Sequence, residues 1–132
     1  MHHQVAVIGR RQLEGLRAAV ADPRLADRAV LVVVHHAPLT ARGRKDKPYH
    51  RLVDGEALLR SLPGPRFAVL HGHIHRRYHH PATSERPHLF GAGSSTQAGR
   101  EGYWLIETER GRIKGGQMMR IGARSVELPL PV

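Results

Sequence analysis

Two short apolar segments, residues 29–34 and 67–70, restrict the folds open to this chain of 132 residues. The first segment is β-branched, has no polar alternation and is bounded by turn-forming residues. Such a run is typical of a strand buried on both faces, as in a parallel sheet covered by helices. The two segments therefore predict an α/β protein in which both lie in one sheet.

Helical periodicity places further elements around these strands. Residues 10–21 carry apolar side chains at i, i+3 and i+7, which predicts an amphipathic helix. A second helix is expected over residues 55–62, with Asp54 as its N-cap. Residues 5–8 form another short apolar run and are expected to be a strand. The predicted order is strand-helix-strand-helix-strand.

The last third of the chain has a different pattern, with short strand candidates separated by glycines. Glycine is common where the chain must turn tightly, so this pattern predicts an antiparallel meander. We expect a single domain over residues 1–132, with α/β character of the α+β sandwich type. The candidate strands of the meander cover residues 88–90, 103–107, 112–113 and 118–121.

The composition limits the environment and the partners. Lys plus Arg exceed Asp plus Glu by 21 − 11 = 10, which favours anionic partners, although solvated surface arginines are the preferred explanation of the excess. The absence of Cys excludes disulfides and thiolate metal sites. No apolar run approaches the ~18 residues of a membrane span, and the first residues do not resemble a signal peptide. A cytoplasmic protein without a membrane partner is the expectation.

Histidines follow both central strands at their carboxyl ends. His35 and His36 come after the first strand, and His73 and His75 come after the second, just past Gly72. The carboxyl ends of parallel strands meet at one edge of a sheet, where sites commonly form. Neutral imidazole is the commonest metal ligand, and a glycine permits a tight turn. The sequence therefore predicts a histidine metal site at this edge.

The remaining histidines lie at the N-terminus or in predicted loops. No strand end or motif sets them apart, so we expect ordinary surface or loop side chains. They are His2, His3, His50, His79, His80 and His88.

The two histidine segments resemble a known family. Val32-Val33-Val34-His35-His36-Ala37-Pro38 and Val69-Leu70-His71-Gly72-His73-Ile74-His75 are similar to the last two motifs of the calcineurin-like metallophosphoesterases. The likeness is strongest to the cyclic-nucleotide-phosphodiesterase-like branch. It extends over about residues 9–113 and includes the Ser94-Ser95-Thr96 segment after a predicted strand.

The resemblance implies a partial metallophosphoesterase fold and two-metal hydrolysis of a phosphoester. It assigns His35 and His73 to one divalent ion and His75 to the other, with Mn, Fe or Zn as the metals. His36 has no ligand role in that pattern, so it is expected behind the ligands or along the loop with Gly72. The implied substrate is a phosphoester small molecule or a nucleotide.

Arg76 and Arg77 directly follow this loop. Arginine suits bidentate contact with phosphate, so both are candidates for a substrate phosphate contact. Solvated loop arginines are the alternative, because the expectation rests on adjacency in sequence alone.

The first three motifs of the family, Asp-x-His, Gly-Asp-x-x-Asp and Gly-Asn-His, have no counterpart here. No acidic residue lies in these patterns, and the chain has no Asn. The resemblance therefore implies a C-terminal half whose bridging carboxylate and catalytic histidine are missing. Catalytic residues stay unassigned, the isolated chain is expected to be weak or inactive, and a missing N-terminal half is the expected partner.

Two other classes of function remain open. One is a histidine metal-binding remnant without catalysis, since three histidines alone can hold one ion. The other is a basic module that binds nucleic acid through its arginine-rich loops. That second class is less favoured, because the loops lack interleaved aromatic residues and no nucleic-acid-binding motif is present.

Overall fold

The predicted helices and central strands are present in the computed structural model, which describes residues 4–121 and 128–129. Strand β1 (Val30–Val34) pairs in parallel with β2 (Phe67–His71), from Val30 opposite Phe67 to Val34 opposite His71. The chain is thus a mixed α/β protein, as the two apolar segments predicted.

Both helices bury an apolar face against this sheet. Helix α1 (Arg10–Val20) buries Leu13, and α2 (Gly55–Arg60) buries Leu58 and Leu59. A short 3₁₀ turn, Pro23–Leu25, follows α1. Among the described residues, no helix is both long enough and apolar enough to cross a membrane.

The first sheet has two further strands that were not expected in it from the sequence. Strand β4 (His88–Ala92) was expected in the meander, but it pairs in parallel with β2. Strand β3 (Arg77–His80) lies in the segment expected to be a loop and pairs antiparallel with β4, so the sheet order is β1-β2-β4-β3. Both expectations were wrong, because β4 is buried along most of its length and belongs to the centre of the sheet.

The expected meander forms a second sheet. Strand β5 (Gly102–Glu109) and β6 (Arg112–Arg120) form an antiparallel hairpin, and β7 (Leu128–Pro129) pairs with the far edge of β6. Residue 110 and residue 111 both have positive φ, at 48° and 72°, which suits a tight two-residue hairpin turn.

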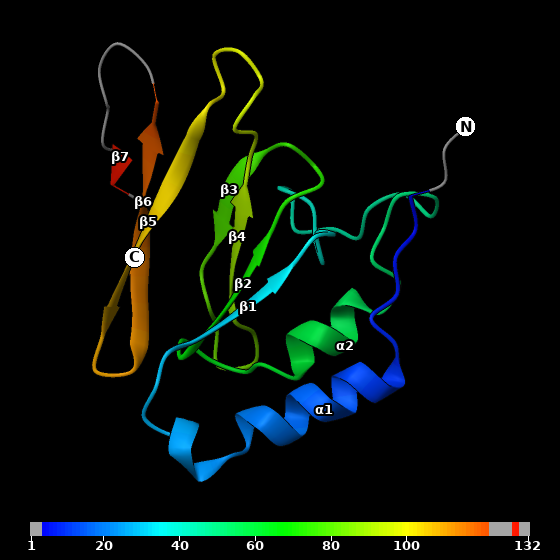
Figure 1. Ribbon diagram of the computed structural model, residues 1–132, viewed down its shortest axis with the longest axis vertical. Coiled ribbons are helices and arrows are strands. Elements are labelled where there is room, and N and C mark those ends of the chain that lie inside the picture. The colour runs from blue at the N-terminus through cyan, green and yellow to red at the C-terminus, as the bar shows by residue number, and fades with distance from the viewer. Residues whose placement is uncertain (1–3, 122–127, 130–132) are drawn as a thin grey trace.

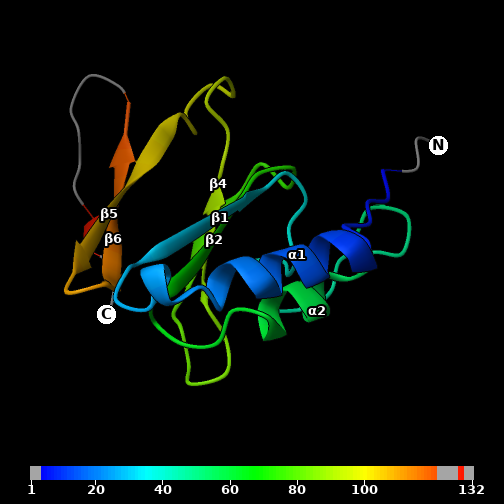
Figure 2. The same ribbon diagram turned by 60° about the horizontal axis from the view of Figure 1, so that its bottom comes forward.

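Alternating residues of the first sheet separate two cores. In β2, Phe67 and Val69 face the helices, whereas Ala68 and Leu70 face the second sheet with Phe90 of β4. The helices therefore cover one face of the first sheet, and the β5–β6 hairpin packs toward the other (Figures 1 and 2). This arrangement has three layers: helices, first sheet and second sheet.

Strand β1 was expected to be buried on both faces, and this expectation was wrong. Val30, Val32 and Val34 pack toward the helices, but Leu31 and Val33 are 47% and 75% exposed. The reason is that β1 is an edge strand, and the second sheet packs over β2 and β4 only.

The expected strand over residues 5–8 is reduced to one isolated bridge between Ala6 and Leu52. Asp54 explains how this segment is held. Its carboxylate accepts hydrogen bonds from the amides of Ile8 and Gly9, at 3.0 and 2.8 Å, and makes no side-chain cap on α2. The predicted N-cap residue therefore fixes the chain that enters α1, where Gly9 has φ of 87°.

A candidate metal centre

The parallel pairing of β1 and β2 places the two histidine segments side by side. Val34 and His71 are register partners at the ends of these strands. Just beyond them, the amide of Gly72 donates a 3.0 Å hydrogen bond to the carbonyl of His35. This bond continues the pairing past the strands and fixes the two segments to each other.

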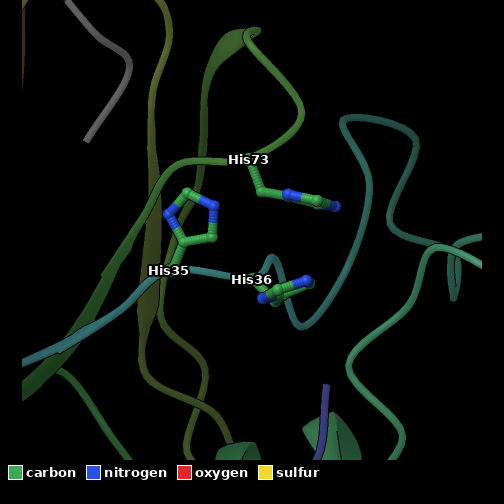
Figure 3. Close-up of side chains that lie close together, drawn as sticks. All are labelled: His35, His36 and His73. Carbon is green, nitrogen blue, oxygen red and sulfur yellow. The ribbon is translucent and has the colours of Figure 1, made fainter. Parts of the chain in front are cut away.

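Three histidines converge at this edge of the sheet. One ring nitrogen from each of His35, His36 and His73 lies within 4.8 Å of the other two. The ring centroid of His35 is 5.2 Å from those of His36 and His73, and the centroids of His36 and His73 are 4.0 Å apart. Figure 3 shows the ring of His73 above His36, with the His35 ring beside them.

An unusual turn carries His73 into this group. His73 has φ of 64°, and the amide of Ile74 donates a 2.7 Å hydrogen bond to the carbonyl of Gly72. His75 also has positive φ, at 57°. The left-handed conformation is therefore adopted by two histidines, His73 and His75, and not by Gly72. Non-glycine residues in this conformation are uncommon, and such local strain is concentrated at functional sites.

The surroundings keep His73 neutral. Burial lowers the pKa of His73 to about 4, and the nearby rings of His36, His50 and His35 act in the same direction. Its Nε2 is buried and makes no hydrogen bond among the described residues. A neutral imidazole with an unpaired buried nitrogen is the form that binds a metal ion.

His36 is also positioned by a backbone contact. Its Nε2 lies 3.0 Å from the carbonyl oxygen of Gln4. Because a carbonyl only accepts, Nε2 carries the proton in this contact and Nδ1 keeps a free lone pair. Hydrogen bonds of this kind commonly set the tautomer of a metal-binding histidine.

Two further residues lie at this site and were not predicted from the sequence: His50, which was expected to be an ordinary loop side chain, and Asp46. The ring of His50 stacks on His73, with centroids 4.1 Å apart, and its Nδ1 lies 2.6 Å from Oδ2 of Asp46. Burial acts to raise the pKa of Asp46, but hydrogen bonds from His50 and Lys47 outweigh it and lower that pKa. The Asp-x-x-x-His spacing in the basic loop was the available signal.

His75, Arg76 and Arg77 lie elsewhere. His75 is exposed and is not one of the three convergent histidines. It lines a cavity of about 430 Å³ together with Arg76 and Arg77. The third member of the convergent group is instead His36, which the resemblance left without a ligand role, whereas His75, which the resemblance assigned to a second ion, lies outside the group.

His79, His80 and His88 were expected to be ordinary surface or loop side chains, but they lie in β3 and β4 and use ring nitrogens within the protein. Nε2 of His79 lies 2.9 Å from Nδ1 of His88, and Nε2 of His80 lies 2.9 Å from the carbonyl oxygen of Thr40. His71 is buried beside Tyr78, and burial lowers its pKa to about 4. Its Nε2 also has no hydrogen-bond partner among the described residues, but His71 is not part of the convergent group. His2 and His3 lie outside the described residues.

The donor set fits one divalent ion of the zinc type. Zinc binds imidazole nitrogen at about 2.0–2.1 Å, so two nitrogens that share one ion are at most about 4.2 Å apart. The three nitrogens here lie within 4.8 Å of one another, so small movements of the rings bring them to one ion. Three histidines leave further coordination positions open, as in catalytic zinc sites. A second ion would require oxygen ligands, and the group found among the described residues consists of histidines alone.

Comparisons with known proteins add no assignment. No protein-family model matches the chain, and no curated protein matches it. The site must therefore be interpreted from its own chemistry.

Proposed function

We propose that this chain provides the histidine ligands of a metal-dependent phosphoester hydrolase of the calcineurin-like metallophosphoesterase type. The observation that carries the proposal is the convergence of His35, His36 and His73 at the carboxyl ends of two parallel strands. In this proposal, the oxygen ligands of a second metal come from another polypeptide segment.

Three further observations support the proposal. The His-His-x-Pro and Gly-His-x-His segments are adjacent in space, as a shared metal centre requires. The first sheet carries helices on one face and a second sheet on the other, which is compatible with half of a metallophosphoesterase sandwich. The cationic excess of the chain suits an anionic phosphoester substrate.

Each residue of the site has a defined task in this proposal. His35, His36 and His73 bind the ion, and His50 packs against His73 and restricts the rotation of its ring. Asp46 holds His50 through the 2.6 Å contact. A divalent ion bound here would polarise a phosphoryl oxygen and lower the pKa of water. The proposed metals are Mn, Fe or Zn.

One observation favours a second candidate function, metal binding without hydrolysis. The described metal-binding group contains no carboxylate, so a hydroxide bridged between two ions is not supported by this chain alone. The second candidate shares the metal site and differs in chemistry only.

Hydrolysis of bis(p-nitrophenyl) phosphate by the purified, metal-loaded chain separates the two functions. The proposal predicts slow turnover that is faster than hydrolysis by the free metal ion alone. This turnover should disappear when a chelator is added and in the His73→Ala variant. Metal uptake with no turnover above the free metal would favour the second candidate. The absence of metal uptake would contradict both. Fast turnover by the chain alone would show that the additional carboxylates are not required.

A further inference from the structure

A separate cavity lies next to the candidate metal centre. It has a volume of about 430 Å³ and a lining dominated by cationic side chains. The two sites are joined by two peptide units, because His73 belongs to the metal centre and His75 to the cavity. At about 3.8 Å between consecutive Cα atoms, the Cα atoms of His73 and His75 are at most about 7.6 Å apart. The polar residues of the lining are His75, Arg76, Arg77, Arg100 and Arg120.

Arg77 is held in a fixed position within this cavity. Its Nε donates a hydrogen bond to the carbonyl of Ala92 at 3.1 Å, and its Nη2 donates to the carbonyl of Arg100 at 3.1 Å. A Cβ at Gly93 would lie 3.0 Å from Nη2, and one at Gly102 would lie 2.8 Å from Nη1. The two glycines therefore leave the space that the guanidinium occupies.

The cavity has an excess of positive charge. No Asp or Glu lines it, and none of its four arginines forms an ion pair within the described part of the chain. Burial lowers the pKa of Arg77, and the charge of Arg120 adds to this effect. Like charges gathered without a counter-charge repel one another, and a bound anion would relieve that repulsion.

We propose that this cavity binds a phosphoryl group of a small substrate that carries two or more phosphoryl groups. The substrate class rests on the proposed function, since a first phosphoryl group would lie at the histidine centre and a second in the cavity. Guanidinium groups bind phosphate through paired hydrogen bonds. The lining has no Phe, Tyr or Trp on which bases could stack, so a small phosphorylated molecule is favoured over single-stranded nucleic acid.

Calorimetric titration with inorganic pyrophosphate tests the cavity independently of the metal centre. The titration uses the full chain with a chelator present, in 150 mM salt. Wild-type protein and His73→Ala should bind equally, because the cavity does not need the metal. Arg76→Gln/Arg120→Gln should weaken binding at least about tenfold, which corresponds to about 1.4 kcal/mol. The matched control Arg112→Gln, an exposed arginine at the opposite end of β6, should leave binding unchanged.

Two outcomes would overturn the inference. These are unchanged pyrophosphate binding in the folded double variant and no binding by wild-type protein. If a single-stranded oligonucleotide displaces pyrophosphate with a steep salt dependence, the ligand of the cavity is nucleic acid and the proposal of a small substrate is wrong. If the double variant does not fold, the exposed single change Arg120→Gln should still weaken binding about threefold. Loss of metal binding with intact pyrophosphate binding would contradict the proposed function alone.

Discussion

Two groups of histidines in the first sheet use the same side chain in opposite ways. His35, His36 and His73 bring ring nitrogens within 4.8 Å of one another, and Nε2 of His73 has no partner among the described residues. His79 and His88 share a 2.9 Å contact between their nitrogens, and the ring of His79 stacks on Phe90 at 4.2 Å. The first group therefore has free ligand atoms, whereas the second forms part of the core.

The difference follows from the positions of these residues in the fold. His35, His36 and His73 lie past the ends of β1 and β2, where the two segments separate after the Gly72–His35 hydrogen bond and the chain turns. His79 and His88 lie inside β3 and β4, where neighbouring side chains surround them. Placement at the carboxyl edge, rather than the number of histidines, separates a ligand from a packing residue.

The largest effect that distinguishes the two groups is expected from the loss of His73. His73→Ala should weaken binding of Zn²⁺ or Mn²⁺ by at least about 100-fold, since second-layer changes alone cost 10- to 100-fold. His79→Ala is the matched control and should retain metal affinity. Isothermal titration at pH 7.5 measures both constants. Equal affinities in the two variants would remove the functional distinction between the groups.

A smaller effect should identify the third ligand. His36→Gln is expected to weaken metal binding at least about tenfold, because one of three nitrogen donors is lost. His75→Gln should change the affinity less than threefold, because His75 is exposed and lies outside the group. Competition with a chromogenic chelator gives both values. A larger loss of metal affinity in His75→Gln than in His36→Gln would favour the ligand set that the family resemblance implies.

His50 should have a smaller effect again, because it supports His73 by packing. We expect His50→Leu to weaken metal binding about threefold to tenfold and to leave the stoichiometry at one ion. Asp46→Asn keeps a hydrogen-bonding group beside His50 and should have a smaller effect. Both constants come from the same titration. A loss as large as that in His73→Ala would make His50 a ligand.

The smallest effect concerns the His79–His88 pair and stability. Burial lowers the pKa of His79 to about 4 and lowers that of His88 as well. The folded chain resists protonation that the unfolded chain accepts below about pH 6.5. The free energy of unfolding should therefore be steady above pH 6.5 and fall as the pH decreases toward 4.

Replacement of one ring tests this pH dependence. His79→Phe should make the decline in the free energy of unfolding between pH 6.5 and 4 shallower. The change in slope should be less than about 1.4 kcal/mol per pH unit, because the pair is partly open to solvent. Urea denaturation at several pH values measures the slope, and exposed His75→Gln is the control. An unchanged slope in His79→Phe would show that the pair does not resist protonation.

The sequence predicted what depends on local pattern. The two central strands and both helices lie where periodicity placed them, and β5 covers the candidate at residues 103–107. The candidates at residues 112–113 and 118–121 form one strand, β6, because Gly115 and Gly116 pair with β5 and do not turn the chain. The pairing of β4 with β2 could not be predicted from the sequence, because a short apolar strand at residues 88–90 is compatible with either sheet. The exposure of Leu31 and Val33 also depended on which strands the second sheet covers.

The candidate site shows the same limit. The strand-end position of His35 and His73 was visible in the sequence, and the structure places them together. The contact of His50 with His73 was not visible, because it depends on how the loop over residues 40–50 folds back across the sheet edge. Sequence spacing could not separate His36 from His75 either. That choice depends on the turn at Gly72–Ile74, where His73 takes a left-handed conformation.

The most direct test is a long-range ¹H–¹⁵N spectrum of the histidine rings during titration with Zn²⁺. We expect one equivalent of Zn²⁺ to shift the ring nitrogens of His35, His36 and His73 together. The signals of His79 and His88 should stay unchanged, because their nitrogens already bond to each other. Saturation without a shift in the three convergent rings, or a shift in the buried pair instead, would contradict the metal centre proposed here.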